Sequence, residues 1–198
     1  DRAADKAAIH MVSAWCQANR LVLGQVATDA KSNEITAIPE LLKMLDITDA
    51  VVTTDAMGCQ KKIAADIRKE GGHYLLQVKG NQETLHDRMK ETFDERTRQA
   101  IAGVSYSFHE EVNGGHGRVE TRRLWATEWI EWFQDRAEWK DLRSFVCLES
   151  VRTINDQTST DRRYYITDLD SRDPKSLLGY ARGHWGVENP LHWSLDVT

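Results

Sequence analysis

The chain has 198 residues, of which 40% are hydrophobic and 29% charged, as is typical of a globular domain with a full hydrophobic core. Its formal net charge of −5 weighs against a simple nucleic-acid-binding module, for which a basic chain is expected, but not against an enzyme whose carboxylates hold a metal ion. No apolar run is long enough to cross a bilayer and the first residues do not resemble a signal peptide, so we expect no membrane partner. Three cysteines, Cys16, Cys59 and Cys147, have no metal-ligand spacing, which indicates reduced thiols and a cytoplasmic protein.

The first elements predicted along the chain are an antiparallel hairpin and a helix. Residues 8–15 and 21–27 are apolar runs joined by a short polar link, which is the pattern of two paired strands. Apolar residues then follow helical spacing over residues 35–45. Pro39 indicates that the regular helix starts near that residue or kinks there.

The next segment predicts alternating strands and helices. Residues 51–55 form a short apolar run that ends at Asp55, as in a strand buried on both faces of a sheet. A helix from residue 63 is closed by two glycines, and a strand over 73–78 and a long helix over 85–99 follow. This order favours parallel strand pairing in an α/β layered sheet.

After residue 103 the pattern changes to a mostly β segment. Four strands are predicted in it, over residues 104–111, 118–126, 145–151 and 163–166. A short amphipathic helix is predicted between them from the aromatic residues Trp129, Trp132, Phe133 and Trp139. We expect this β segment, about residues 103–168, to be inserted before a last helix that Pro174 opens, and to pack beside the sheet without extending it.

The last stretch of the chain, residues 180–196, concentrates charged and aromatic side chains. His184, Glu188 and His192 recur at four-residue steps, so a helix places them on one face. The best partner for the carboxylate of Glu188 is Asp55, at the end of a predicted strand. An aspartate at a strand end that faces a glutamate on a helix is typical of a divalent-metal site with oxygen ligands.

Each of these residues also has an ordinary structural interpretation. Asp55 is suited to capping the turn that follows its strand, and Glu188 to an ion pair with Arg182 or His192. His184, Glu188 and His192 also suggest a two-histidine, one-carboxylate site for zinc or iron. That site is the weaker interpretation, because a proline interrupts the helix between the ligands and their spacing is too wide for one ion.

Basic side chains supply candidate contacts to phosphate groups. Lys79 follows a predicted strand, and Arg118 and Arg122 lie on one side of another strand. The ordinary alternative for these three residues is a solvated hairpin face.

Five blocks of the sequence, in the same order along the chain, closely resemble blocks of bacterial insertion-sequence transposases: Lys31-Ser-Asn-Glu-Ile, Asp55-Ala-Met-Gly, Lys79-Gly-Asn-Gln82, His116-Gly-Arg-Val-Glu-Thr-Arg122 and Arg182-Gly-His-Trp-Gly-Val-Glu-Asn189. The nearest kind is the H-repeat-associated group of the DDE superfamily, and the resemblance runs from about residue 8 to the last residue. It implies an α/β, RNase H-like fold, a mixed sheet flanked by helices, in one catalytic domain over residues 1–198.

The resemblance also implies an activity, namely DNA cleavage and strand transfer by an Asp-Asp-Glu triad on two Mg²⁺ ions, with Mn²⁺ as a substitute. Asp55 resembles the second aspartate of this triad and Glu188 the glutamate. The implied partner is DNA, both as transposon ends and as target. A homodimer with a second copy of the chain is a further option that the resemblance implies. The implied DNA contacts are Lys79, Arg118, Arg122, Arg182 and His184.

The first aspartate of the family lies in an Asp-Gly-Lys-Thr block, and the sequence contains no such block. We therefore expect residues 1–198 to lack one metal ligand and one central strand, and to be inactive alone. Two alternatives stay open. One is a catalytically dead remnant that only binds DNA or partner subunits, and the other is a nuclease or hydrolase of the same fold that does not transpose.

Overall fold

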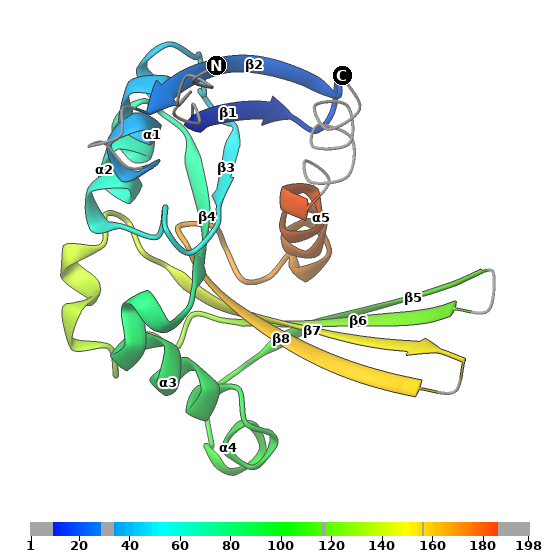
Figure 1. Ribbon diagram of the computed structural model, residues 1–198. Helices are drawn as coiled ribbons and strands as arrows, with labels where there is room; N and C mark the ends of the chain where they lie inside the picture. Colours follow the sequence, from blue (N-terminus) through cyan, green and yellow to red (C-terminus); the bar gives the residue numbers. More distant parts are fainter. Residues whose placement is uncertain (1–9, 29–33, 116–117, 156, 186–198) are drawn as a thin grey trace, which may run out of the picture.

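A computed structural model describes residues 10–28, 34–115, 118–155 and 157–185 (Figure 1). The strands are β1 His10–Cys16, β2 Leu21–Thr28, β3 Val51–Thr54, β4 His73–Val78, β5 Ser107–Gly115, β6 Arg118–Thr127, β7 Ser144–Ile154 and β8 Gln157–Thr167. The α-helices are α1 Glu34–Lys43, α2 Lys61–Lys69, α3 Glu83–Thr92, α4 Glu95–Ala100 and α5 Pro174–Trp185, and short 3-10 helices span Gly80–Gln82 (η1) and Gln134–Glu138 (η2).

Six of the strands form one mixed sheet in the order β3-β4-β8-β7-β6-β5. β3 and β4 pair in parallel, as their order with α2 predicts, and the other pairs are antiparallel. Together with helices on both faces, this sheet confirms the expected α/β fold and is consistent with an RNase H-like arrangement.

The expectation that the β segment packs beside the sheet is wrong. β8 pairs directly with β4, from Leu75 opposite Thr167 to Val78 opposite Tyr164, so β5–β8 extend the sheet. The reason lies in the last four residues of β8, which are all buried and therefore suit a central strand covered on both faces. We refer to the four antiparallel strands β5–β8 as the arm, because they project well beyond the helices (Figure 1).

The expected first hairpin is confirmed, since β1 and β2 pair antiparallel. They form a separate two-stranded sheet that rests on α1. A methyl group on Gly24 would lie 3.1 Å from Leu41 Cδ1, which shows how closely β2 approaches this helix. Within the described residues, β1 and β2 have no ladder with β3.

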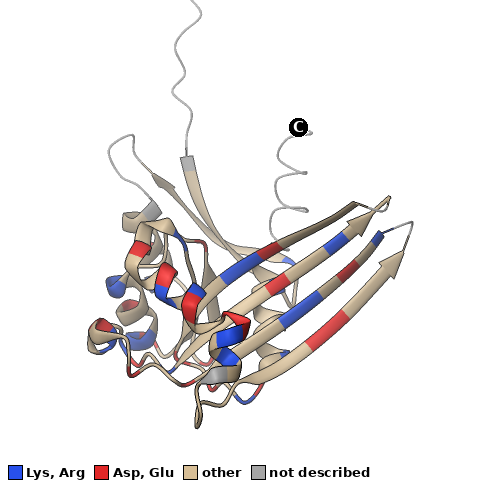
Figure 2. Ribbon diagram, turned by 90° about the horizontal axis from the view of Figure 1, so that it is seen from below, with Lys and Arg blue, Asp and Glu red and all other residues tan. Residues whose placement is uncertain are grey.

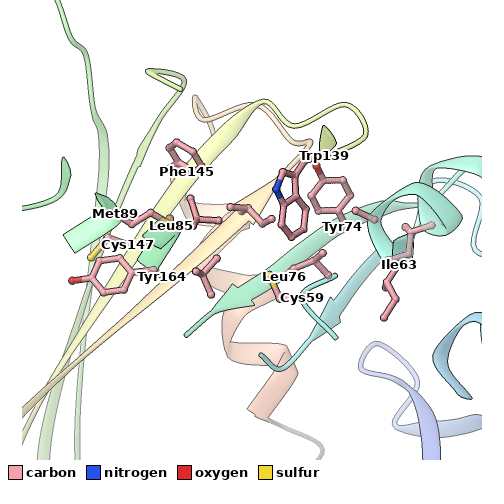
Figure 3. Packing of buried hydrophobic residues seen from close by; sticks show 14 of the residues in the cluster. Cys59, Ile63, Tyr74, Leu76, Leu85, Met89, Trp139, Phe145, Cys147 and Tyr164 are labelled. Carbon is pink, nitrogen blue, oxygen red and sulfur yellow. The ribbon is translucent and has the colours of Figure 1, made fainter. Parts of the chain in front are cut away.

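The sheet has a hydrophobic layer on each face. On one face α2, α3 and the segment before β7 cover residues that include Tyr74, Leu76 and Tyr164. Trp139, at 2% exposure, belongs to the same cluster and lies next to Tyr74 (Figure 3). On the other face α5 packs through Leu177, Leu178 and Ala181 on Leu75, Leu124, Val146, Leu148 and Tyr165. This second layer carries α5 toward the end of β3.

Three helix predictions need correction. The long helix expected over residues 85–99 is broken into α3 and α4, because Asp94 caps α4 by accepting a hydrogen bond from the Arg96 backbone N–H. α1 begins at Glu34 and runs through Pro39, so the proline does not open it, and the alternative of a kink at Pro39 stays a prediction. No α-helix forms over the described residues 129–139, where only η2 is helical, because aromatic rings such as Trp132 pack individually on Phe145.

The two glycines after α2 close this helix, as the sequence predicts. Gly71 has a φ of 79°, a left-handed conformation that glycine adopts without strain, and the backbone N–H of Gly72 donates to the Ile67 carbonyl. The chain can therefore reverse directly into β4. In the described part of the chain, no helix is both long and apolar enough for a membrane span.

Candidate functional site

Asp55 lies in the tight turn that follows β3. Its Oδ1 accepts hydrogen bonds from the backbone N–H groups of Met57, at 3.0 Å, and Gly58, at 3.3 Å. The expected turn-capping role is therefore present. Both bonds use Oδ1, so the turn orients the half-buried carboxylate while Oδ2 takes no part in it.

Gly58 is needed for the closeness of this turn. A methyl group at Gly58 would lie 2.6 Å from both Cβ and Oγ1 of Thr54, which is closer than real side chains pack. Asp55, which follows the strand, and Gly58, which closes the turn, are thus fixed relative to each other. This also fixes the direction of the Asp55 side chain.

The block that begins at Lys79 packs against the Asp55 turn. Asn81 Nδ2 donates to the Ala56 carbonyl at 2.5 Å, and Gln82 Nε2 donates to the Cys59 carbonyl at 3.2 Å. Because β3 and β4 are parallel, their carboxyl ends meet at one edge of the sheet, where ligands of α/β folds usually bind. Lys79 is exposed at this edge.

The last described turn of α5 is attached to β3, to the arm and to the first hairpin. His184 Nδ1 lies 3.3 Å from Thr53 Oγ1, two residues before Asp55. Arg182 Nη1 donates to Glu111 Oε2 on β5 at 2.7 Å. A methyl group on Gly183 would overlap the side chain of Gln17, in the turn between β1 and β2. α5 is therefore held against the strand that leads into the candidate site.

Glu188, the second predicted metal ligand, lies outside the described residues, as does His192 of the alternative zinc or iron site. The predicted closeness of the Asp55 and Glu188 carboxylates therefore stays a prediction. Within the described ranges, no group of three or more histidine, cysteine, aspartate or glutamate side chains is placed to hold a metal ion.

Arg118 and Arg122 on β6 are engaged with the carboxylate between them. Glu120 is 8% exposed, Arg122 Nη2 lies 2.7 Å from its Oε1, and Arg118 Nη2 pairs with its Oε2. Burial alone would raise the pKa of Glu120, but the ion pairs with Arg118 and Arg122 outweigh it and lower the pKa. The Arg118 side chain is 42% exposed and that of Arg122 only 17%, so Arg118 has more surface left for a phosphate contact.

Gln77 on β4 is a polar residue of this region that the sequence analysis did not single out. It is 1% exposed, and its Oε1 has no hydrogen-bond partner among the described residues. The available signal was the single amide in the otherwise apolar second half of this strand, Leu75-Leu-Gln-Val78. A sequence shows the amide but not whether it is satisfied, so burial was needed to recognise it.

The donor atoms near the carboxyl end of β3 suit a hard divalent cation. Asp55 Oδ2 is a carboxylate oxygen outside the turn hydrogen bonds, and Gln77 Oε1 is an orphaned carboxamide oxygen on the neighbouring strand. Mg²⁺ and Mn²⁺ prefer oxygen ligands of this kind. The residues present therefore fit such an ion, for which Asp55 would supply the charged oxygen.

Comparison with known proteins shows the family of the chain. Residues 1–197 match the family model described as "Transposase DDE domain". The whole chain is 45% identical over 201 residues to "Putative transposase YncI" of Escherichia coli O157:H7 and covers 50% of that protein. It is 43% identical over 203 residues to "H repeat-associated putative transposase YhhI" of Escherichia coli strain K12 and covers 53% of it, so the chain spans about half the length of these relatives. The chain therefore belongs to the transposase DDE domain family.

Proposed function

We propose that this chain is the catalytic region of a transposase that cleaves DNA ends and joins them to target DNA with Mg²⁺, or Mn²⁺ as a substitute. The observation that carries the proposal is the contact between His184 and Thr53, at 3.3 Å. This contact places the helix that leads toward Glu188 against the strand that ends at Asp55.

In this proposal, Asp55 and Glu188 are the ligands that hold the divalent cations. When bound, such ions polarise the phosphodiester and lower the pKa of attacking water. The turn hydrogen bonds keep the Asp55 carboxylate directed before any ion binds. Lys79, Arg118, Arg122, Arg182 and His184 contact phosphate groups of transposon-end and target DNA.

We propose further that the third acidic ligand comes from a strand that pairs with the open edge of β3. β3 is an apolar run typical of a central strand, yet in the described residues it pairs only with β4, while β1 and β2 form their own sheet. Because the sequence contains no Asp-Gly-Lys-Thr block, residues 1–198 would hold two of the three ligands. Strand transfer needs both ions in place for in-line attack, so these residues alone would be inactive.

The test is cleavage of a transposon-end duplex in Mg²⁺ and in Mn²⁺. The 198-residue chain is compared with the same chain extended at its N-terminus by a segment that carries an Asp-Gly-Lys-Thr block. We expect no cleavage by the chain alone, cleavage by the extended chain, and loss of that cleavage with Glu188→Gln. Robust cleavage by the chain alone, abolished by Glu188→Gln, would show that another residue supplies the third ligand, and cleavage that survives Glu188→Gln would refute the site.

The absence of the Asp-Gly-Lys-Thr block favours a second candidate, a catalytically inactive remnant that binds only DNA or partner subunits, including a second copy of itself in a homodimer. An extended chain that binds the duplex, or dimerises, without cleaving it would support this candidate. In either case we place the protein in the cytoplasm, where its three free thiols stay reduced.

A further inference from the structure

Gln77 is an unusual side chain for its position. β4 is buried between the two helical layers, and its neighbours Leu75, Leu76 and Val78 are at most 1% exposed. An amide oxygen without a hydrogen bond in such surroundings is unfavourable, and nearly all buried polar atoms in folded proteins have a partner. Since Oε1 of Gln77 has none among the described residues, a group other than those residues is expected to satisfy it.

Strand register places Gln77 beside Asp55. β3 and β4 are parallel with Thr53 opposite Leu75 and Thr54 opposite Leu76, so Asp55 follows at the level of Gln77. Alternation along the strands puts Gln77 on the face of Leu75, which α5 covers, and the His184 contact puts Thr53 on that same face. Neighbouring strands are about 4.8 Å apart, a distance that one water molecule or one hydrated ion can bridge between side chains.

We propose that Gln77 is a positioning residue of the metal site, whose Oε1 accepts a hydrogen bond from a water molecule on the cation that Asp55 holds. This inference rests on the proposed function, because it requires a cation at Asp55. Mg²⁺ gives up its water ligands reluctantly, so a neutral acceptor beside its carboxylate ligand fixes a bound water without adding charge. Outer partners of this kind orient the ligands of a metal and tune its affinity.

The proposal predicts that one substitution of Gln77 changes stability and metal binding in opposite directions. A leucine at position 77 has a similar size and removes the unsatisfied oxygen, so it stabilises the fold while it weakens cation binding. A glutamate at the same position retains an oxygen and adds a charge, so it strengthens cation binding. If Gln77 had no role at the metal site, Gln77→Leu would stabilise the fold and leave cation binding unchanged.

The experiment measures Mn²⁺ binding to the 198-residue chain by electron paramagnetic resonance, and thermal unfolding without metal, for Gln77→Leu and Gln77→Glu. The matched control is Gln157→Leu, the same change at an exposed strand position of the arm. For Gln77→Leu we expect Mn²⁺ binding about tenfold weaker and a melting temperature about 2–4 °C higher. For Gln77→Glu we expect tighter Mn²⁺ binding, and for Gln157→Leu no change in Mn²⁺ binding.

A higher melting temperature of Gln77→Leu with unchanged Mn²⁺ affinity would overturn the proposal, and so would a lower melting temperature, since Oε1 would then have a structural partner. Asp55→Asn distinguishes this failure from that of the proposed function. If Asp55→Asn abolishes Mn²⁺ binding and Gln77→Leu does not alter it, only the role of Gln77 is refuted. If Mn²⁺ binding is absent, or is unaffected by Asp55→Asn, the metal site itself is refuted.

Discussion

The arm and the parallel half of the large sheet, β3 and β4, differ in how one set of polar side chains in each is paired. In the arm, a row of four residues crosses the strands with alternating charge, Glu110, Arg123, Glu149 and Arg162, each opposite the next in register. Neighbours in the row are joined by ion pairs of 2.6, 3.3 and 2.7 Å, and Figure 2 shows red and blue segments alternating over this part of the sheet. In the parallel half, Asp55 offers one oxygen outside its turn and Gln77 Oε1 is unsatisfied within the described residues.

The charged residues of the row in the arm pair with one another, whereas Gln77 Oε1 has no partner among the described residues. The long antiparallel pairs of the arm allow each charge of the row to meet its opposite, so these polar residues stabilise the fold. At the carboxyl ends of β3 and β4, Asp55 is half-buried and Gln77 is buried, and a buried polar group lowers stability unless it has a partner. Variants in the two halves should accordingly change different properties.

The largest expected effect is the loss of DNA cleavage with Asp55→Asn in the N-terminally extended chain. Asparagine keeps the Oδ1 acceptor of the turn, so the free energy of unfolding should change by less than about 0.5 kcal/mol. In the proposed site it removes the charged metal ligand, and since metal ions contribute several kcal/mol to such reactions, cleavage should fall at least about 1,000-fold. Asp161→Asn, on the exposed part of β8, is the control and should leave cleavage unchanged. Equal cleavage by both variants would show that the arm and the parallel strands do not differ in their effect on cleavage.

A second change, Gly58→Ala, tests how rigidly the Asp55 turn is built. The added methyl group meets Thr54 at 2.6 Å, so we expect a loss of about 1–3 kcal/mol in the free energy of unfolding, measured with urea. Gly80→Ala is the matched control, because a methyl group there meets nothing within 4 Å. A Gly58→Ala protein as stable as Gly80→Ala would mean that the turn relaxes and does not fix Asp55.

Local sequence patterns predicted the elements that depend on neighbouring residues. The apolar run before Asp55, the alternation that follows it and the glycine at position 71 were sufficient for β3, α2 and β4 and for their parallel pairing. The break between α3 and α4 was also local, but the capping preference of Asp94 was overlooked in a long charged segment.

Features that depend on distant residues could not be predicted in this way. The pairing of β8 with β4 joins residues about 90 positions apart, and nothing in the spacing of either strand selects that partner. The pairing of Arg122 with Glu120 and the orphaned oxygen of Gln77 depend on burial, which a sequence does not display. For the candidate site, therefore, the sequence indicated the carboxylates by pattern and by resemblance, and the fold was needed to find the unsatisfied amide oxygen of Gln77 on the neighbouring strand.

Glu149→Gln tests the same comparison with a substitution in the arm. Glu149 is 6% exposed and accepts from both Arg123 and Arg162, so its loss leaves Arg162 without a carboxylate in the row. Because both arginine side chains are about 40% exposed, we expect only about 1–2 kcal/mol lower free energy of unfolding, with cleavage by the extended chain unchanged. Glu110→Gln, at the exposed end of the row, should cost less. A loss of cleavage without a loss of stability would place the row in the active region instead.

The smallest expected effect is a dependence of arm stability on pH through Glu120. Its pKa in the folded chain is lowered from the ordinary value of 4.5, because the ion pairs with Arg118 and Arg122 outweigh its burial. A lowered folded pKa means that the stabilisation is complete above the ordinary value and is lost as the pH falls through the folded one. Wild type should therefore exceed Glu120→Gln in free energy of unfolding at pH 7, and this difference between the two proteins should narrow below about pH 4.5.

The pH-dependent part of this difference should stay under about 1 kcal/mol, since Arg118 and a more distant Arg152 are both exposed, and it should shrink in high salt. Urea unfolding of both proteins between pH 3 and about pH 7 measures this difference, and a constant difference across that range would show that the Glu120 carboxylate contributes by packing and not by charge.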